Sequence, residues 1–196
     1  MHIKSATFQI SAPSLEACPV SELPEFAFVG RSNVGKSSLL NMLVGGKTLA
    51  KVSATPGHTQ LINFFSMNGE WSLVDLPGYG FAKTAGPDRE RFQDMIATYL
   101  SGRTNLARVF VLIDSRHRPQ QIDLDFIQWL TSVAVPVALV FTKTDLMKAG
   151  AVQKNIDLFR EEVSAWCEIP PRIFTSSSTT GTGRRELLEC IEQSLA

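Results

Sequence analysis

The chain has 196 residues, of which 44% are hydrophobic and 19% charged, and its formal net charge is +0. This length suits one domain with a full core, and the balanced charge excludes a disordered chain or a basic nucleic-acid coat protein. Three scattered cysteines exclude a disulfide framework. No stretch has the roughly 18 apolar residues of a membrane span, and no signal peptide is visible. We therefore expect a cytoplasmic protein with reduced thiols.

The first 23 residues have no strong pattern. They show weak strand character around residues 7–10 and end before Pro24. We expect an N-terminal tail over residues 1–23 and one domain over residues 24–196.

The first strongly patterned element is an apolar strand over residues 26–29, followed by GRSNVGKS and a helix over residues 36–44. In such a loop the glycines let backbone amides wrap a phosphate, and the helix N-terminus adds partial positive charge. Lys36 would reach the β and γ phosphate oxygens and Ser37 would ligate magnesium. The sequence thus predicts a phosphate-binding loop formed by Gly30, Arg31, Ser32, Asn33, Val34, Gly35, Lys36 and Ser37.

A polar loop with proline and glycine follows over residues 53–60. Its threonines could ligate magnesium, and we expect only a bound triphosphate to order it. The residues alone do not choose between Thr55 and Thr59, and an ordinary solvent-exposed turn is the simpler alternative for this loop taken by itself.

Apolar strands are predicted over residues 61–66 and 71–74, joined by Met-Asn-Gly-Glu, a strong signal for a tight antiparallel hairpin. The sequence Asp75, Leu76, Pro77, Gly78 comes directly after the second of these strands. Its carboxylate could hold a magnesium-bound water and its glycine amide could contact a γ phosphate. Many GTPases have a glutamine directly after this glycine, and its side chain orients the water that attacks the γ phosphate. This chain has Tyr79 there, so we expect it to hydrolyse a bound nucleoside triphosphate slowly without a partner.

A helix over residues 87–101, a strand over 108–113, a helix over 120–132 and a strand over 137–141 lead to Thr142, Lys143, Thr144 and Asp145. Ligands bind at the carboxyl ends of strands in open α/β sheets. Asp145 could accept hydrogen bonds from guanine N1 and N2, while the stem of Lys143 lies along the base. Thr142 replaces the more familiar asparagine, and its hydroxyl could brace the phosphate loop.

The last elements are a helix over residues 152–167, a strand over 172–174 and a helix over 184–195. Thr175, Ser176 and Ser177 follow the final strand, and their backbone amides could contact guanine O6. The alternation of strands and helices predicts an α/β fold of the three-layer P-loop NTPase, small GTPase-like type. We expect a mostly parallel six-stranded sheet with one antiparallel edge strand and helices on both faces.

Two functions use such a phosphate loop. The first is a GTP-dependent switch whose hydrolysis step turns it off. The second is a P-loop nucleoside or metabolite kinase, which needs an acceptor pocket and usually an arginine-rich lid. The sequences DLPG and TKTD are typical of the switch and favour a GTPase that converts GTP to GDP and phosphate.

Nearly the whole chain resembles the EngB (YihA/YsxC) family of bacterial ribosome-biogenesis GTPases, in the TrmE-Era-EngA-EngB-septin-like class. The most specific segments are FVGRSNVGKSSLLNML, LAKVSATPGHTQLINFF, VDLPGYGFA, FTKTD and FTSSS. The resemblance selects Thr59, with Ser37, as a magnesium ligand. With the motif chemistry above, we expect Lys36, Asn33, Thr59 and Gly78 to be the catalytic residues. The resemblance also implies nucleotide contacts from Gly57, His58, Thr59, Gln60 and Leu61.

The resemblance further implies a partner, the large ribosomal subunit or its precursors, and a role in cell division and septation. A septation factor acting outside ribosomes would share the same site. We expect a monomer in the bacterial cytoplasm. Asn33 occupies the position at which potassium-activated relatives coordinate a potassium ion, although it could instead hydrogen-bond the loop backbone. A basic face for ribosomal RNA could include Lys47, Lys51, Lys83, Arg103, Arg108, Arg116, His117 and Arg118, although scattered, solvated charges explain these residues equally well.

Overall fold

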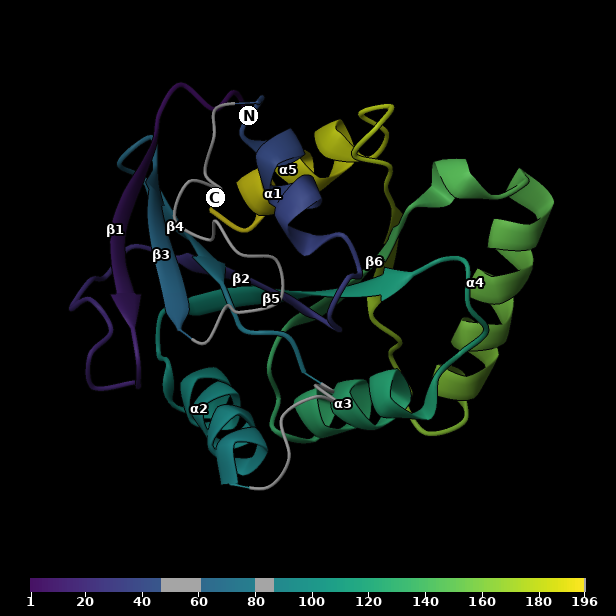
Figure 1. The fold of residues 1–196 in the computed structure, drawn as a ribbon, viewed down its shortest axis with the longest axis horizontal. Coiled ribbons are helices and arrows are strands. Elements are labelled where there is room, and N and C mark those ends of the chain that lie inside the picture. Colours follow the sequence, from purple (N-terminus) through teal and green to yellow (C-terminus); the bar gives the residue numbers. More distant parts are fainter. Residues whose placement is uncertain (47–60, 80–86, 196) are drawn as a thin grey trace.

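The computed structural model describes residues 1–46, 61–79 and 87–195, with the backbone alone for residues 87–92. Every strand and helix expected from the sequence is present within these residues, with ends that differ by a few residues (Figure 1). The strands are β1 (Ala6–Ala12), β2 (Glu25–Gly30), β3 (Ile62–Met67), β4 (Trp71–Asp75), β5 (Leu106–Asp114), β6 (Val137–Thr142) and β7 (Arg172–Thr175). The helices are α1 (Lys36–Leu43), α2 (Pro87–Gly102), α3 (Gln121–Ser132), α4 (Ala149–Ser164) and α5 (Arg184–Gln193), with a 3-10 turn, η2, at Thr144–Leu146.

The strands form one sheet in the order β1-β3-β4-β2-β5-β6-β7. Strand β3 is antiparallel to both of its neighbours, whereas the pairs from β4 to β7 are parallel. At the β3–β4 hairpin Asn68 and Gly69 have φ values of 56° and 73°. Positive φ at both central residues is what a two-residue hairpin requires, so the predicted hairpin is confirmed.

The fold class is confirmed, but the sheet has seven strands rather than six. The additional strand is β1, which lies in the region expected to be a tail and pairs with β3. Because it is an edge strand, most of its side chains are exposed, including Phe8 and Ile10 at 40% each. It therefore lacks the apolar run of a buried strand. Its presence also puts the antiparallel strand β3 second from the edge instead of at the edge.

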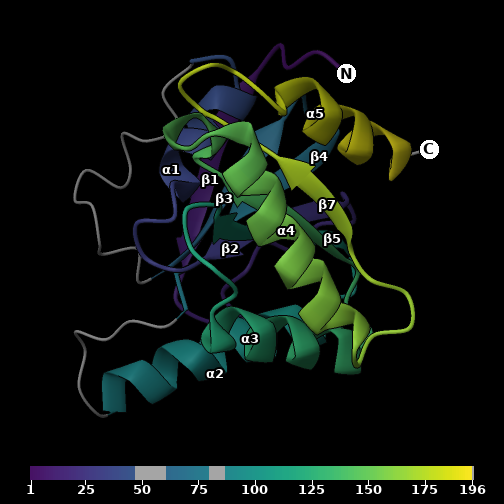
Figure 2. The same cartoon turned by 90° about the vertical axis from the view of Figure 1, so that its right-hand side faces the viewer.

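Helices cover both faces of the sheet, and the sheet separates the hydrophobic core into two parts (Figures 1 and 2). Helices α1 and α5 pack with alternate side chains of the central strands, such as Phe28 and Phe110, whose rings stack at a centroid distance of 4.8 Å. Helices α2, α3 and α4 pack against the opposite face, around Val29 and Val111. Burial on both faces explains why β2, β5 and β6 have nearly continuous apolar sequences.

A buried ion pair lies at the amino end of β2. Glu25 is fully buried and accepts hydrogen bonds from Arg103 at 2.6 and 2.9 Å and from the Tyr99 hydroxyl at 2.7 Å. Arg103 also donates to the Pro19 carbonyl at 2.6 Å. The Arg103 side chain is mostly buried and its charge is paired with Glu25, so it is poorly placed for a basic RNA-binding face.

The parallel arrangement brings the carboxyl ends of β2, β4, β5, β6 and β7 to the same edge of the sheet. The loops with the predicted motifs leave the sheet at this edge. The expected nucleotide contacts Gly57, His58, Thr59 and Gln60, together with Thr55, lie outside the described residues. Among the described helices, none has the length and apolar character needed to cross a membrane.

Candidate functional site

The phosphate loop joins β2 directly to α1, as predicted. Gly30 lies so close to β5 that an added Cβ would be 2.9 Å from the Leu112 carbonyl oxygen. Gly35 has a φ of 100° and precedes the helix without a side-chain cap, and no acidic residue stands in the first turn. The amides at this helix end are therefore suited to bind an anion. Ser37 lies exposed in the same turn.

Lys36 and Asp75 form an ion pair across the site. The Lys36 ammonium contacts Asp75 Oδ1, and the two side chains are 11% and 8% exposed. Lys36 begins α1 and Asp75 ends β4, so residues predicted from two separate motifs meet here. The Lys36 ammonium and the Asp75 carboxylate therefore meet directly beside the phosphate loop.

The DLPG segment continues the pairing of β4 with β2 past the end of the strand. The Leu76 amide donates to the Phe28 carbonyl at 3.0 Å, and Tyr79 forms an isolated parallel bridge with Arg31. Between them, a Cβ on Gly78 would lie 2.9 Å from the Gly30 carbonyl oxygen. Only glycine fits this approach, so Gly78 lies directly on the backbone of the phosphate loop.

Tyr79 is buried against α3. It is 5% exposed, its ring stacks on Phe126 at 4.2 Å, and its hydroxyl donates to Asp123 at 2.8 Å. Burial, followed by the nearby Asp123 carboxylate, raises the pKa of Tyr79 well above its ordinary value. The phenol is therefore neutral and tied to α3.

The TKTD sequence is bound to the phosphate loop by Thr142. This residue is 4% exposed, and its hydroxyl donates to the Val34 carbonyl at 2.6 Å and lies 3.2 Å from the Ile113 carbonyl. The prediction that the threonine hydroxyl braces the phosphate loop is confirmed. Asp145 lies exposed in η2, beside this braced segment.

Lys143 adds a second tie between the two loops. It adopts a φ of 59°, and its ammonium donates to the Asn33 carbonyl and, at 2.8 Å, to Asp114. Its stem passes over Gly35, where an added Cβ would lie 3.6 Å from Lys143 Cε. This places the aliphatic part of Lys143 beside the phosphate loop.

Asp114 is a site residue that the sequence analysis missed. It ends β5, and besides Lys143 it binds Arg116 through both carboxylate oxygens, at 2.8 and 2.9 Å. Burial acts to raise its pKa, but the hydrogen bonds from Arg116 and Lys143 outweigh burial and lower the pKa well below its usual range. Its position in the sequence could have identified it. Asp114 stands at the carboxyl end of a parallel strand, and ligands bind at these strand ends in open α/β sheets.

The loop after β7 packs beside TKTD. The Ser176 amide donates to the Phe141 carbonyl at 2.7 Å, and the Thr144 amide donates to the Ser176 carbonyl at 3.2 Å. The Ser177 amide donates to the Thr182 carbonyl at 3.2 Å, and Thr175 is exposed. The Ser176 and Ser177 amides thus have partners inside the protein, which contradicts the expectation that they contact guanine O6.

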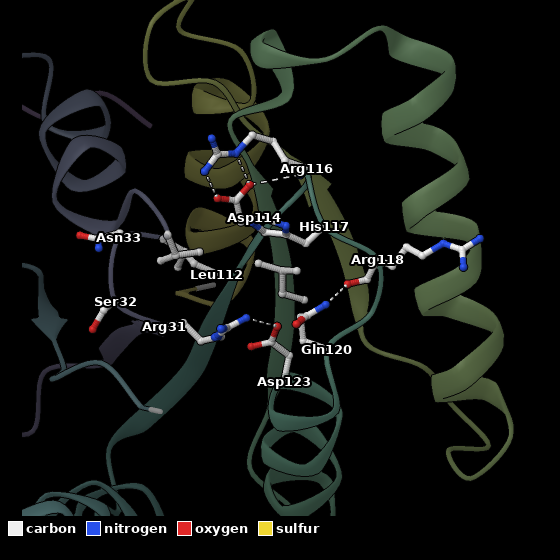
Figure 3. A pocket seen from close by; sticks show the side chains of 12 residues that line it. Arg31, Ser32, Asn33, Leu112, Asp114, Arg116, His117, Arg118, Gln120 and Asp123 are labelled. Atoms are coloured by element: carbon white, nitrogen blue, oxygen red, sulfur yellow. Dashed lines mark hydrogen bonds and ion pairs between the residues drawn. The ribbon is translucent and has the colours of Figure 1, made fainter. Parts of the chain in front are cut away.

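A pocket of about 130 Å³ lies between the phosphate loop, the end of β5 and the start of α3 (Figure 3). Arg31 and Asp123 face each other across its floor, and Asp114 with Arg116 forms its upper wall. Burial is the main reason that the pKa of Asp123 is raised, although the Tyr79 hydroxyl and Arg31 act in the opposite direction. Arg116, expected on a basic face, is exposed and paired with Asp114, which it shares with Lys143.

The geometry gathers a phosphate loop, a carboxylate opposite its lysine, a glycine against the loop and an exposed aspartate next to the strand ends. Comparisons with known proteins agree with this arrangement. Residues 25–143 match the family described as "50S ribosome-binding GTPase". A protein of Christiangramia forsetii described as "Probable GTP-binding protein EngB" is 49% identical to this chain, and the match covers 98% of this chain and 97% of that protein.

A Porphyromonas gingivalis protein with the same description is 48% identical over 98% of this chain and 96% of its own length. A solved structure of an EngB protein superimposes with a TM-score of 0.70 at 26% identity, over 87% of this chain and 98% of that one. The GTPase interpretation, rather than the kinase alternative, is therefore confirmed. The chain belongs to the EngB family of GTP-binding proteins and is a P-loop GTPase that binds GTP and GDP.

Proposed function

We propose that this protein is a slow GTP-driven switch that assists assembly of the large ribosomal subunit. In this proposal Gly30 to Ser37 hold the phosphates, Asp75 to Gly78 sense the γ phosphate, and Thr142 to Asp145 hold guanine, supported by the adjacent loop from Thr175 to Ser177. The observation that carries it is the double tie from Thr142 and Lys143 to the phosphate loop, because it couples the base-binding segment to the phosphate-binding segment.

The Lys36–Asp75 ion pair suggests how the site changes when it fills. GTP brings several negative charges to a place where Asp75 already neutralises the lysine. Lys36 would turn to the phosphate oxygens, which also accept charge-assisted hydrogen bonds and together carry more negative charge than one carboxylate. Asp75 would then be released from Lys36. GTP binding thus requires this ion pair to open, and Asp75 becomes available to a new cation.

The oxygen donors at this position fit a magnesium ion. Ser37 and Asp75 offer a hydroxyl and a carboxylate, and magnesium usually takes one or two protein oxygens together with phosphates and water. The described residues contain no cluster of three or more histidine, cysteine or acidic side chains that would bind a metal alone. Ser37 would ligate the ion with Thr59, and Asp75 would hold one of its waters. When bound, the ion would neutralise charge on the β and γ phosphates.

Slow intrinsic hydrolysis follows from the absence of a water-orienting side chain after Gly78. Tyr79 is committed to Asp123, so positioning and charge stabilisation fall to Lys36, Asn33, Thr59 and the Gly78 amide. A switch that carries a glutamine turns over at about 10⁻⁴ to 10⁻³ per second, and a partner adds roughly 10⁵-fold. We expect a similar intrinsic rate here, measured in single-turnover reactions; fast hydrolysis of isolated protein would contradict this.

Asn33 is proposed to help coordinate a potassium ion beside the phosphates. The residue has a φ of 64°, a conformation that asparagine tolerates better than most residues, so the backbone provides a second reason for its presence. The two explanations make different predictions. If potassium takes part, hydrolysis is faster in potassium than in sodium buffer at equal ionic strength; equal rates would leave only the backbone reason.

The ribosomal partner is proposed from the family to which residues 25–143 belong. The direct test is co-sedimentation of purified protein with large ribosomal subunits and their precursors, in GDP and in a non-hydrolysable GTP analogue. We expect binding with the analogue and weak binding with GDP. Equal binding in both states would contradict a switch, and no binding in either would contradict this partner. A cytoplasmic location, a monomeric state and a contribution to septation are further parts of the proposal.

A further inference from the structure

We propose that Asp123 is a positioning residue for GTP hydrolysis, holding Tyr79, and through it Gly78, against the phosphate loop. The inference rests on the proposed contact between the Gly78 amide and the γ phosphate. Nothing in the sequence motifs points to Asp123, which lies in the first turn of α3 and is 3% exposed.

One buried carboxylate contacts both motifs that handle the phosphates. Its Oδ1 atom accepts the Tyr79 hydroxyl at 2.8 Å, and its Oδ2 atom lies 3.9 Å from a guanidinium nitrogen of Arg31. Tyr79 directly follows DLPG, and Arg31 is the second residue of the phosphate loop. Figure 3 shows Arg31 and Asp123 pointing toward each other below the rest of the pocket. Asp123 is therefore a shared anchor for the two segments.

The backbone between these contacts has little freedom. Arg31 and Tyr79 form a β-bridge, and a Cβ on Gly78 would lie 2.9 Å from the Gly30 carbonyl and 3.4 Å from the Ser32 amide nitrogen. The ring of Tyr79 is stacked between this bridge and α3, on Phe126. With its ring packed and its hydroxyl bound, Tyr79 restrains the Gly78–Tyr79 peptide. Because the adjoining Gly78 Cα packs against the phosphate loop, this restraint also limits the orientation of the Gly78 amide, one peptide earlier.

A purely packing role for this position would be better served by an apolar side chain. The adjacent buried positions of α3 are Leu124 and Ile127. A buried carboxylate costs desolvation energy unless its partners offset that cost, and burial is the largest influence on its pKa. The carboxylate is useful here because it accepts from Tyr79 and faces Arg31 at once, which an apolar side chain cannot do.

The reaction gives a clear way to separate positioning from folding. GDP has no γ phosphate, so a displaced Gly78 leaves GDP binding unchanged and affects only the triphosphate state. The variants are Tyr79→Phe, which keeps the stacked ring and removes the hydroxyl, and Asp123→Asn, which keeps an acceptor oxygen and removes the charge. Asp125→Asn is the matched control, because Asp125 lies exposed two residues further along α3 and bonds only Gln121 among the described contacts.

The experiment measures single-turnover GTP hydrolysis and the dissociation constant for GDP in each variant, with thermal unfolding as a check on folding. We expect Tyr79→Phe to lower the hydrolysis rate about five- to tenfold, the value of one hydrogen bond, while GDP affinity stays within about twofold. Asp123→Asn should have a smaller effect and add nothing in the Tyr79→Phe background, since both act through one contact. Asp125→Asn should match wild type.

Unchanged hydrolysis in both Tyr79→Phe and Asp123→Asn would overturn the inference and leave the proposed function intact. A parallel loss of GDP affinity, hydrolysis and thermal stability would also overturn it, since that pattern indicates a structural role alone. Failure of the wild-type protein to hydrolyse GTP would instead contradict the proposed function, and the inference would fall with it.

Discussion

The Thr142 hydroxyl offers a direct way to weaken the tie between the base-binding segment and the phosphate loop. Thr142→Val keeps the branched shape of the side chain and replaces the hydroxyl with a methyl group. In the protein this group donates at 2.6 Å to the Val34 carbonyl, and the Ile113 carbonyl lies at 3.2 Å. Because a hydroxyl has one proton, the shorter bond accounts for most of the interaction.

The expected magnitude follows from that single bond. A neutral hydrogen bond contributes about 1 kcal/mol net, and leaving a buried acceptor unpaired costs about 1–3 kcal/mol. Valine opens no cavity at this buried site, so the loss in free energy of unfolding should be about 1–2 kcal/mol. The phosphate loop also loses its brace, and we expect GDP affinity to fall about three- to tenfold, where tenfold corresponds to about 1.4 kcal/mol.

Urea unfolding of the nucleotide-free protein gives the stability change, and titration with a fluorescent GDP analogue gives the affinity. Thr142→Ser is the matched control, since it keeps the hydroxyl and loses only a methyl group. Its GDP affinity should stay near that of wild type. If Thr142→Val binds GDP as tightly as Thr142→Ser, the hydroxyl does not couple the two loops and the reasoning is refuted.

Three further predictions follow. Arg103→Met leaves the carboxylate of Glu25 buried without its cation, so urea unfolding should show a loss of about 3–5 kcal/mol, with GDP affinity unchanged; a loss below about 1 kcal/mol would contradict it. The pKa of Asp114 is lowered in the folded state, so its stabilising contribution is present above pH ~4 and is lost as the pH falls further. The difference in free energy of unfolding between wild type and Asp114→Asn should therefore shrink in acid. A difference that stays constant with pH would contradict this prediction. Gly78→Ala forces a Cβ to within 2.9 Å of the Gly30 carbonyl, so single-turnover hydrolysis should fall at least about tenfold; a wild-type rate would show that the loop yields freely.

The central strands could be predicted because they are buried on both faces. Residues such as Phe26 to Val29 and Val137 to Phe141 form unbroken apolar runs that require no knowledge of their partners. Strand β1 gave only a weak signal, because an edge strand with one face in solvent keeps polar residues, and its pairing with β3 depends on contacts more than fifty residues away. The hairpin was visible because Asn68 and Gly69 have a local conformational requirement.

The candidate site also contains residues that could be predicted from local sequence and residues that depend on contacts made by the fold. Glycines, lysine and aspartate in GRSNVGKS, DLPG and TKTD have roles set by residue type and spacing, and the structure brings the described ones together. Asp123 could not be found in this way, because its importance comes from Tyr79 and Arg31, which meet only when α3 packs on the sheet. The weak clue was an acidic residue on the apolar face of a helix, four positions before Ile127.

The central claim is that Asp145, held beside the phosphate loop, selects guanine nucleotides. Calorimetric titration of wild type and Asp145→Asn with GDP and ADP tests it most directly. Wild type should bind GDP more than about a hundredfold more tightly than ADP, because adenine leaves the carboxylate unpaired, and Asp145→Asn should lose most of this preference. Equal affinity of wild type for GDP and ADP, or an unchanged preference in Asp145→Asn, would contradict the account.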